Sequence, residues 1–327
     1  MEKKEKEPKM MPSKIRLSHS SLEKYHLCSE RWRLHYQEGY RTNSIGSALF
    51  FGNAFGSAVQ EGAKNGLTIE ETKILFDKYF KSMDFNGEII DLENTDKTRY
   101  YKGDLKIEYV PLEIISTVDP KILEDLPSVF KLQNEGNLHY DYQKDLNKLC
   151  WYSMKYKGHR LIESYYEKVI PRIKKVYEIE KPINLETNDG SAHLIGFIDL
   201  IVDFEMDDGS VQKVLFDNKT ASKPYSKNAI IEKQQLTIYE YAENIGKVGY
   251  IVAIKDTFKI QILIGEIPID IQEKYITIID ETLHNIKNNV FEKNPKSCRA
   301  FGQICEFYDI CFKSDDSKLI KKEVKNA

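Results

Sequence analysis

Charged side chains interrupt two apolar, strand-like segments in the second half of the chain. In "VLFDNKTAS" (214–222), Asp217 and Lys219 follow three apolar residues, and side chains two apart on a strand point to the same side. In "GFIDLIVDF" (196–204), Asp199 also stands among apolar residues. Two carboxylates on paired strands are costly to bury unless something compensates them, and a hard divalent cation takes such oxygen ligands. Lys219 could then stabilise an anion that develops beside the cation. The alternative for Asp217 and Lys219 is a surface ion pair, which contributes little stability.

These residues need strands and a helix to position them. Three strand-like runs, "VYEIEKPINLET", "HLIGFIDLIVDF" and "VQKVLFDNKT", follow one another, and "EMDDGS" marks the last two as a hairpin. "NAIIEKQQLTIYEYAENIG" reads as an amphipathic helix with Asn228 as N-cap and Gly246 as its stop. Two further strands, "VGYIVAIKD" and "KIQILIGEIP", and a helix over 271–289 complete an α/β core. We expect Glu180, on the first of these strands, to face solvent rather than to support a metal site.

The first half of the chain has a helical pattern. "SHSSLEKYHLCSERWRLHY" (18–36) predicts one helix, the Gly-rich "GSALFFGNAFGSAVQEGA" (46–63) predicts a second, and residues 68–173 are mostly helical. Aromatic and basic residues of the first helix could contact a nucleic-acid strand by stacking and charge. The alternative is that the tryptophan packs into the core and the bases form a solvated face. These residues are Trp32, Arg31, Arg33 and Lys24.

Composition limits the class of protein. The chain of 327 residues is 41% hydrophobic and 30% charged, with a net charge of −3. This profile excludes a histone-like polycation but not a basic groove, because 48 Lys and Arg residues can cluster locally. No apolar run approaches the ~18 residues of a membrane span, and the start is charged rather than signal-like. We therefore expect a cytoplasmic protein of a prokaryotic cell or a virus-infected host, without a membrane partner.

The motifs "GFID", "FDNKT" and "QLTIY" resemble successive motifs of the PD-(D/E)XK nuclease superfamily, specifically its RecB-type exonuclease branch. This branch includes the CRISPR-associated RecB-like and AddB-like nucleases. The resemblance implies an α/β, restriction-endonuclease-like core, with a central mixed sheet flanked by helices. It implies that Asp199 and Asp217 ligate Mg²⁺ or Mn²⁺ and that Lys219 is the catalytic lysine. It also implies that Gln235 and Tyr239, one helical turn apart, face the active site and help to place DNA. Their alternative is an ordinary half-buried helix face.

Three cysteines crowd the C-terminal segment "NPKSCRAFGQICEFYDIC". They are separated by six and five residues, and the absence of a Cys-x-x-Cys knuckle counts against a zinc ribbon. In the RecB-type branch, one distant upstream cysteine and three near the C terminus hold a [4Fe–4S] cluster. The resemblance therefore assigns the cluster to Cys28, Cys298, Cys305 and Cys311, joining the first helix to the end of the chain. The alternative is scattered core cysteines, which is our expectation for Cys150.

One position departs from the family pattern. The family usually carries a histidine metal ligand in the form Gly-x-x-x-His on the Gly-rich helix, whereas here Gly56 is followed by Gln60 at that place. An amide oxygen can still ligate a hard cation, although it is a weaker ligand. Gln60 is therefore a candidate third ligand and the main argument for an inactive relative.

Together these observations predict one nuclease domain over residues 17–312, between a disordered charged arm (1–16) and a charged tail (313–327). Its parts are N-terminal helices (17–66), a helical insertion (67–173), an α/β catalytic core (174–268), and a C-terminal helix with the cysteine segment (269–312). The predicted function is metal-dependent exonuclease action on DNA with a free end, in recombination, repair or processing. No Walker-type motif occurs, so a helicase or recombination protein would be a separate partner. The rivals are an iron–sulfur DNA-binding or assembly protein with a degenerate nuclease fold, and a sequence-specific endonuclease, which would have no need of the four cysteines.

Overall fold

The computed structural model describes residues 15–42, 47–80, 82–83, 89–90, 143–302, 304–317 and 319–322. The chain divides into two compact units. The sheet unit comprises Asn43–Lys181 and Ile198–Pro268, and the cysteine unit comprises Met1–Thr42, Pro182–Phe197 and Ile269–Ala327. The expectations for residues 1–14, for residues 91–142 of the insertion and for the side chain of Cys150 lie outside the described residues.

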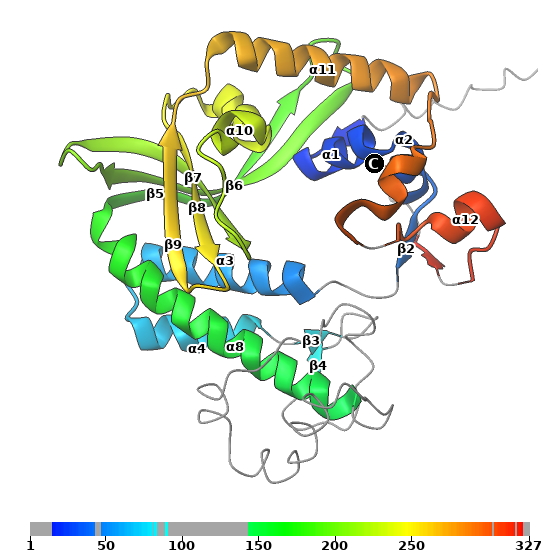
Figure 1. Cartoon of the computed structure of the whole chain (residues 1–327). Helices are drawn as coiled ribbons and strands as arrows, with labels where there is room; N and C mark the ends of the chain where they lie inside the picture. Colours follow the sequence, from blue (N-terminus) through cyan, green and yellow to red (C-terminus); the bar gives the residue numbers. More distant parts are fainter. Residues whose placement is uncertain are drawn as a thin grey trace, which may run out of the picture. The chain divides into compact units, whose positions relative to one another are not determined.

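The sheet unit is built on strands that lie side by side in the order β6, β7, β8, β9, and β5 also pairs with β6 (Figure 1). Their bounds are β5 (Ile173–Glu186), β6 (Ala192–Glu205), β7 (Val211–Ala221), β8 (Val248–Ile254) and β9 (Lys259–Gly265). β6 and β7 are antiparallel, β7 and β8 parallel, and β8 and β9 antiparallel. The turn between β6 and β7 contains Gly209 at φ 81°, a conformation that glycine adopts without steric cost. The predicted hairpin and the mixed sheet are confirmed.

Helices α3 (Ser47–Asn65), α4 (Ile69–Tyr79) and α8 (Gln143–Lys168) cover one face of this sheet (Figure 1). Aromatic side chains of these helices form one core with alternate residues of β6 and β7. They include Phe51, Phe55, Phe76 and Tyr165 from the helices and Leu200, Val202, Phe204, Val214 and Phe216 from the strands. Because successive side chains alternate across a strand, the residues between these strand positions point to the opposite face, toward α10.

The helix expected between Asn228 and Gly246 is divided in the structure. α9 (Ala229–Glu232) ends at Lys233, which has an extended conformation, and α10 (Gln235–Glu243) then begins at Gln235. The C-cap of α10 is Asn244, with φ 50°, and Gly246 follows two residues later. The remaining short elements of this unit are the 3₁₀ turn η3 (Ile170–Arg172) and the antiparallel pair β3 (Ser82–Met83) and β4 (Ile89–Ile90).

The cysteine unit combines the N-terminal elements with the C-terminal ones. Its elements are β1 (Ile15–Leu17), α1 (His19–Leu27), α2 (Ser29–Trp32), the π-helical turn η1 (Arg33–Gln37), β2 (Tyr40–Thr42), α11 (Ile269–Lys287), the 3₁₀ helix η4 (Pro295–Gly302), α12 (Tyr308–Lys313) and β10 (Leu319–Lys321). β1 pairs in parallel with the first residues of β6, and β10 pairs antiparallel with β2. The single helix predicted over 18–36 is interrupted at Cys28, whose backbone is extended. β10 lies within the expected charged tail. None of the helices in the described ranges is long and apolar enough to cross a membrane.

Candidate active site

Asp199 of β6 and Asp217 of β7 lie next to each other in the sheet unit. Leu200 is paired with Phe216, which brings the adjacent Asp199 and Asp217 to the same place along the two strands. The backbone N–H of Asn218 donates to Oδ2 of Asp199 at 2.7 Å. Asp217 is only 1% exposed. Burial raises the pKa of Asp199 well above its usual range, and the negative charge of Asp217 raises it further. A buried and a partly buried carboxylate that repel each other in this way would both ionise readily only beside a cation.

Lys219 provides one positive charge at this site. Its Nζ lies 2.7 Å from Oδ2 of Asp217, while 32% of the Lys219 side chain remains exposed. Burial lowers the pKa of Lys219, but Asp217 and then Asp199 outweigh burial, so the net pKa is raised. For Asp217, burial raises the pKa and Lys219 opposes the shift. Because the carboxylate of Asp217 is buried, Asp217 and Lys219 do not form an ordinary surface ion pair.

Gln235 and Tyr239 join the same cluster from α10. Nε2 of Gln235 donates to Oδ1 of Asp217 at 2.7 Å and to the hydroxyl of Tyr239 at 2.8 Å. Tyr239 is 4% exposed, and burial, followed by the charge of Asp217, raises its pKa. The spacing of one helical turn places both side chains at the carboxylates, and their contribution to DNA placement stays a prediction.

Gln60 approaches the cluster from α3, through Glu180. The Gln60 side chain is 2% exposed and hydrogen-bonds the carboxylate of Glu180, while its Oε1 is buried without a hydrogen-bond partner. Glu180 is exposed, as expected, but its charge also raises the pKa of Asp199. Its backbone has φ 48°, an uncommon conformation for a residue other than glycine. Burial raises the pKa of Glu180 itself, and the hydrogen bond from Gln60 opposes this shift. Glu180 thus borders the site. Period-two alternation along a strand does not reveal a left-handed backbone conformation of this kind.

The side-chain oxygen atoms at this site are of the kind that a hard divalent cation binds. Among the residues that the structure describes, no three His, Cys, Asp or Glu side chains are grouped closely enough to hold a metal ion. Asp199 and Asp217 supply two carboxylates, and a buried amide oxygen without a partner, such as Oε1 of Gln60, is costly unless it finds one. Mg²⁺ is commonly bound by one or two carboxylates, with water and substrate phosphate completing its shell. The residues present fit such an ion.

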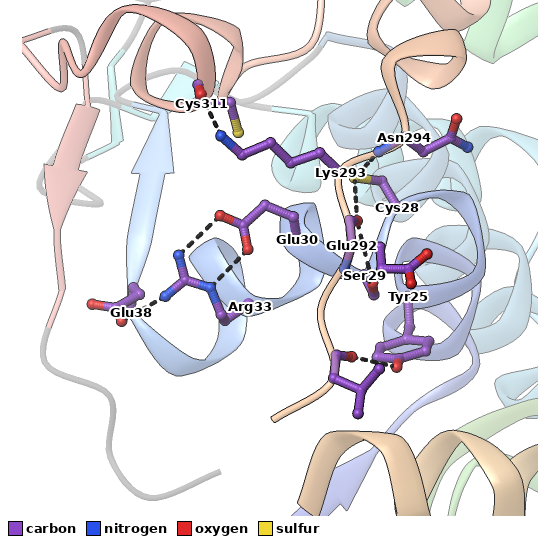
Figure 2. A network of polar contacts seen from close by, with 11 residues as sticks. Tyr25, Cys28, Ser29, Glu30, Arg33, Glu38, Glu292, Lys293, Asn294 and Cys311 are labelled. Carbon is purple, nitrogen blue, oxygen red and sulfur yellow. Dashed lines mark hydrogen bonds and ion pairs between the residues drawn. The ribbon is translucent and has the colours of Figure 1, made fainter. Parts of the chain in front are cut away.

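The four predicted cluster cysteines all lie in the cysteine unit. Cys28 follows α1, where its Sγ donates to the carbonyl of Glu292 at 3.7 Å and accepts from the N–H of Asn294 at 3.4 Å (Figure 2). Figure 2 also shows Lys293 reaching the carbonyl of Cys311, at 2.6 Å. The thiols interact electrostatically in a chain: Cys311 with Cys305 and Cys28, and Cys305 with Cys298. Burial raises the pKa of Cys311 to about 11 and also raises that of Cys305. Among the residues that the structure describes, however, no three of these thiols lie closely enough together to hold a metal ion.

The aromatic and basic residues of the N-terminal segment have protein partners. Trp32 is 3% exposed and stacks on Phe291 with ring centroids 5.9 Å apart, so the packing alternative holds for it. Arg31 forms a two-pronged ion pair with Glu306. In Figure 2, Arg33 similarly binds Glu30 and reaches Glu38. Burial lowers the pKa of Lys24 to about 8, and Glu306 partly opposes the shift. The contacts of Trp32, Arg31 and Arg33 therefore hold the unit together.

Comparison with known proteins gives one family. The family model described as "PD-(D/E)XK nuclease superfamily" matches residues 123–312, which include β5 to β9, α10 and the three C-terminal cysteines but not Gln60 or Cys28. Among solved structures, "Crystal structure of SSO0001" is similar at 17% identity and a TM-score of 0.27, covering 54% of this chain and 78% of that chain. A search of curated proteins finds no match.

Proposed function

This chain belongs to the PD-(D/E)XK nuclease superfamily over residues 123–312, and we propose that it is a metal-dependent exonuclease that hydrolyses DNA from a free end. The observation that carries the proposal is the contact of Lys219 with the buried Asp217 beside Asp199. Removing such charges from water costs several kcal/mol per ion, and a structural role would be served as well by apolar residues. A site that keeps these charged residues supports catalysis, whereas a site that had lost its activity would have no need of them.

The residues around the carboxylates suit phosphodiester hydrolysis. A bound Mg²⁺ or Mn²⁺ would supply Lewis acidity at the scissile phosphate. The N–H of Asn218 orients Asp199, and the amide of Gln235 orients Asp217. Water adds to phosphorus, the P–O bond to the leaving oxygen breaks, and the proton released by the water ends on that oxygen. The ammonium of Lys219, which lies 2.7 Å from Oδ2 of Asp217, would stabilise the developing negative charge as a cation.

We further propose that the four cysteines of the cysteine unit hold a [4Fe–4S] cluster with a structural role. Backbone contacts support it: the N–H of Cys305 donates to the carbonyl of Cys298 at 2.8 Å, and the adjacent Lys293 and Asn294 bond Cys311 and Cys28. Four thiolates are the usual ligands of such a cluster, which would join the N-terminal elements to the C-terminal segment.

A second function has one observation in its favour. Gln60 replaces the histidine that the RecB-type branch usually carries, and this replacement favours a DNA-binding protein without cleavage. The orientation of Gln60 by Glu180 argues against that rival, because its oxygen is left available to a cation.

The discriminating experiment uses end-labelled linear and circular single-stranded DNA of one sequence, with and without Mg²⁺ or Mn²⁺. We expect metal-dependent loss of linear DNA with circular DNA left intact. Cleavage of the circle would identify an endonuclease, and binding of both substrates without cleavage would favour the degenerate protein. Asp217→Asn, purified in parallel, controls for contaminating nuclease.

A further inference from the structure

The sheet face that carries the catalytic carboxylates continues along β6 to an exposed tyrosine. Asp203 lies four residues beyond Asp199 on the same side of the strand, which places it about 13 Å away. The hydroxyl of Tyr177, on β5, donates to Oδ2 of Asp203 at 2.9 Å. Tyr177 is nevertheless 39% exposed, so its ring is fixed at one end and open to solvent.

Two lysines lie against this ring. Nζ of Lys175 is 4.4 Å from the ring centroid of Tyr177, and Nζ of Lys213 is 4.1 Å from it. Lys213 is the residue paired with Asp203 in the register of β6 and β7. A cation at this distance from an aromatic ring is attracted to it, and this attraction limits the conformations that the lysine side chain samples.

These two lysines differ from the other cations of the same edge. Arg172 is paired with Asp207, and Lys174 with Glu205. Within the described ranges, neither Lys175 nor Lys213 has a carboxylate at ion-pair distance. These two lysines therefore outnumber the one carboxylate that the register places beside them, Asp203, which accepts the hydrogen bond of Tyr177.

We propose that Tyr177, Lys175 and Lys213, here called the lysine–tyrosine patch, bind the backbone of a single DNA strand whose end enters the active site. The proposal rests on the proposed function and specifies where that site holds its substrate. The net charge of −3 gives the chain no general attraction for DNA, and the catalytic carboxylates repel phosphates, so local cations must supply the attraction. The competing explanation is that the ring only covers the apolar stems of the two lysines.

The test is the salt dependence of single-stranded DNA binding, measured by fluorescence anisotropy in EDTA so that no cleavage occurs. The variant is Lys175→Ala/Lys213→Ala. The matched control is Lys64→Ala/Lys78→Ala, which removes two exposed lysines from α3 and α4, the helices that cover the opposite face. Each phosphate contact with single-stranded DNA contributes about 0.7 to the slope of log K against log salt. The patch variant should therefore lower the magnitude of this slope by about 1.4 and weaken binding several-fold.

Tyr177 provides a second comparison. Tyr177→Phe keeps the ring and should bind DNA as the wild type does, whereas Tyr177→Ala should weaken binding because the lysines lose their support. If the patch variant has the slope of the wild type, or if the control variant loses as much, the lysine–tyrosine patch is not a DNA contact. These results would leave the proposed nuclease intact, because cleavage of dinucleotides and other very short substrates does not need the patch. A wild-type protein that binds no single-stranded DNA would overturn the patch, whereas the proposed exonuclease is overturned only if linear DNA is not cleaved in the presence of metal.

Discussion

Replacing Lys219 by methionine tests whether the ion pair of Lys219 and Asp217 contributes to stability as a buried pair or as a surface pair. Methionine keeps much of the apolar stem but removes the ammonium that lies 2.7 Å from Oδ2 of Asp217. Removing one partner of a buried pair costs about 3–5 kcal/mol, whereas exposed pairs contribute about 0.2–1 kcal/mol. Asp217 is buried but 32% of the Lys219 side chain is exposed, so we expect a loss near the lower limit, about 2–3 kcal/mol.

The chain offers a matched control in Lys247. Its Nζ lies 2.7 Å from Oε1 of Glu266, and its side chain is also 32% exposed, but the carboxylate of this pair is 67% exposed. Lys247→Met should therefore change the free energy of unfolding by less than about 1 kcal/mol. The two variants thus differ mainly in the burial of the carboxylate that loses its partner.

The assay is urea unfolding of both variants and the wild type in EDTA at pH 7. A second variant, Lys219→Met/Asp217→Asn, removes both charges and should recover much of the lost stability, giving a coupling free energy of about 2 kcal/mol. If Lys219→Met costs no more than Lys247→Met, the contact of Lys219 with Asp217 is energetically a surface pair. The argument from buried charge would then be wrong.

Asp199, the four cysteines of the cysteine unit and Gln60 each give a further prediction. The folded-state pKa of Asp199 is raised well above its unfolded value, so its contribution to stability in EDTA is present below about pH 4 and is lost as pH rises toward the folded-state pKa. Asp199→Asn should therefore gain stability relative to the wild type as pH rises above about 4. A stability difference that does not vary with pH would contradict this. Protein purified without oxygen should contain about four iron and four sulfide per chain, and serine at Cys28, Cys298, Cys305 or Cys311 should remove them, whereas Cys150→Ser should not; stoichiometric zinc in a colourless protein would exclude the cluster. Gln60→His should tighten Mn²⁺ binding in calorimetry more than Mg²⁺ binding, because imidazole suits transition metals; unchanged affinities for both ions would place Gln60 away from the metal.

The residues of the site that share one strand or one helix could be predicted from the sequence. Asp217 and Lys219 are two residues apart on a strand, and Gln235 and Tyr239 are four apart on a helix, so each pair shares a side whatever the rest of the fold does. The Asp-Gly hairpin then brings Asp199 to Asp217, because antiparallel register follows from the turn.

Other features depend on contacts between distant segments, which local periodicity does not reveal. The helix predicted through Cys28 is interrupted at that residue, whose sulfur contacts Glu292 and Asn294. The environment of Trp32 is set by Phe291. Glu180 is exposed as the strand pattern predicts, but that pattern does not reveal its left-handed backbone or its contact with Gln60.

The central claim is that Asp217 binds a cation and that Lys219 acts on the phosphate. The most direct measurement determines Mn²⁺ affinity by calorimetry and cleavage of linear DNA on the same preparations of the wild type, Asp217→Ala and Lys219→Ala. We predict that Asp217→Ala loses both properties, whereas Lys219→Ala loses cleavage by several orders of magnitude and keeps Mn²⁺ binding. Cleavage at the wild-type rate by either variant, in a preparation free of contaminating nuclease, would contradict the account.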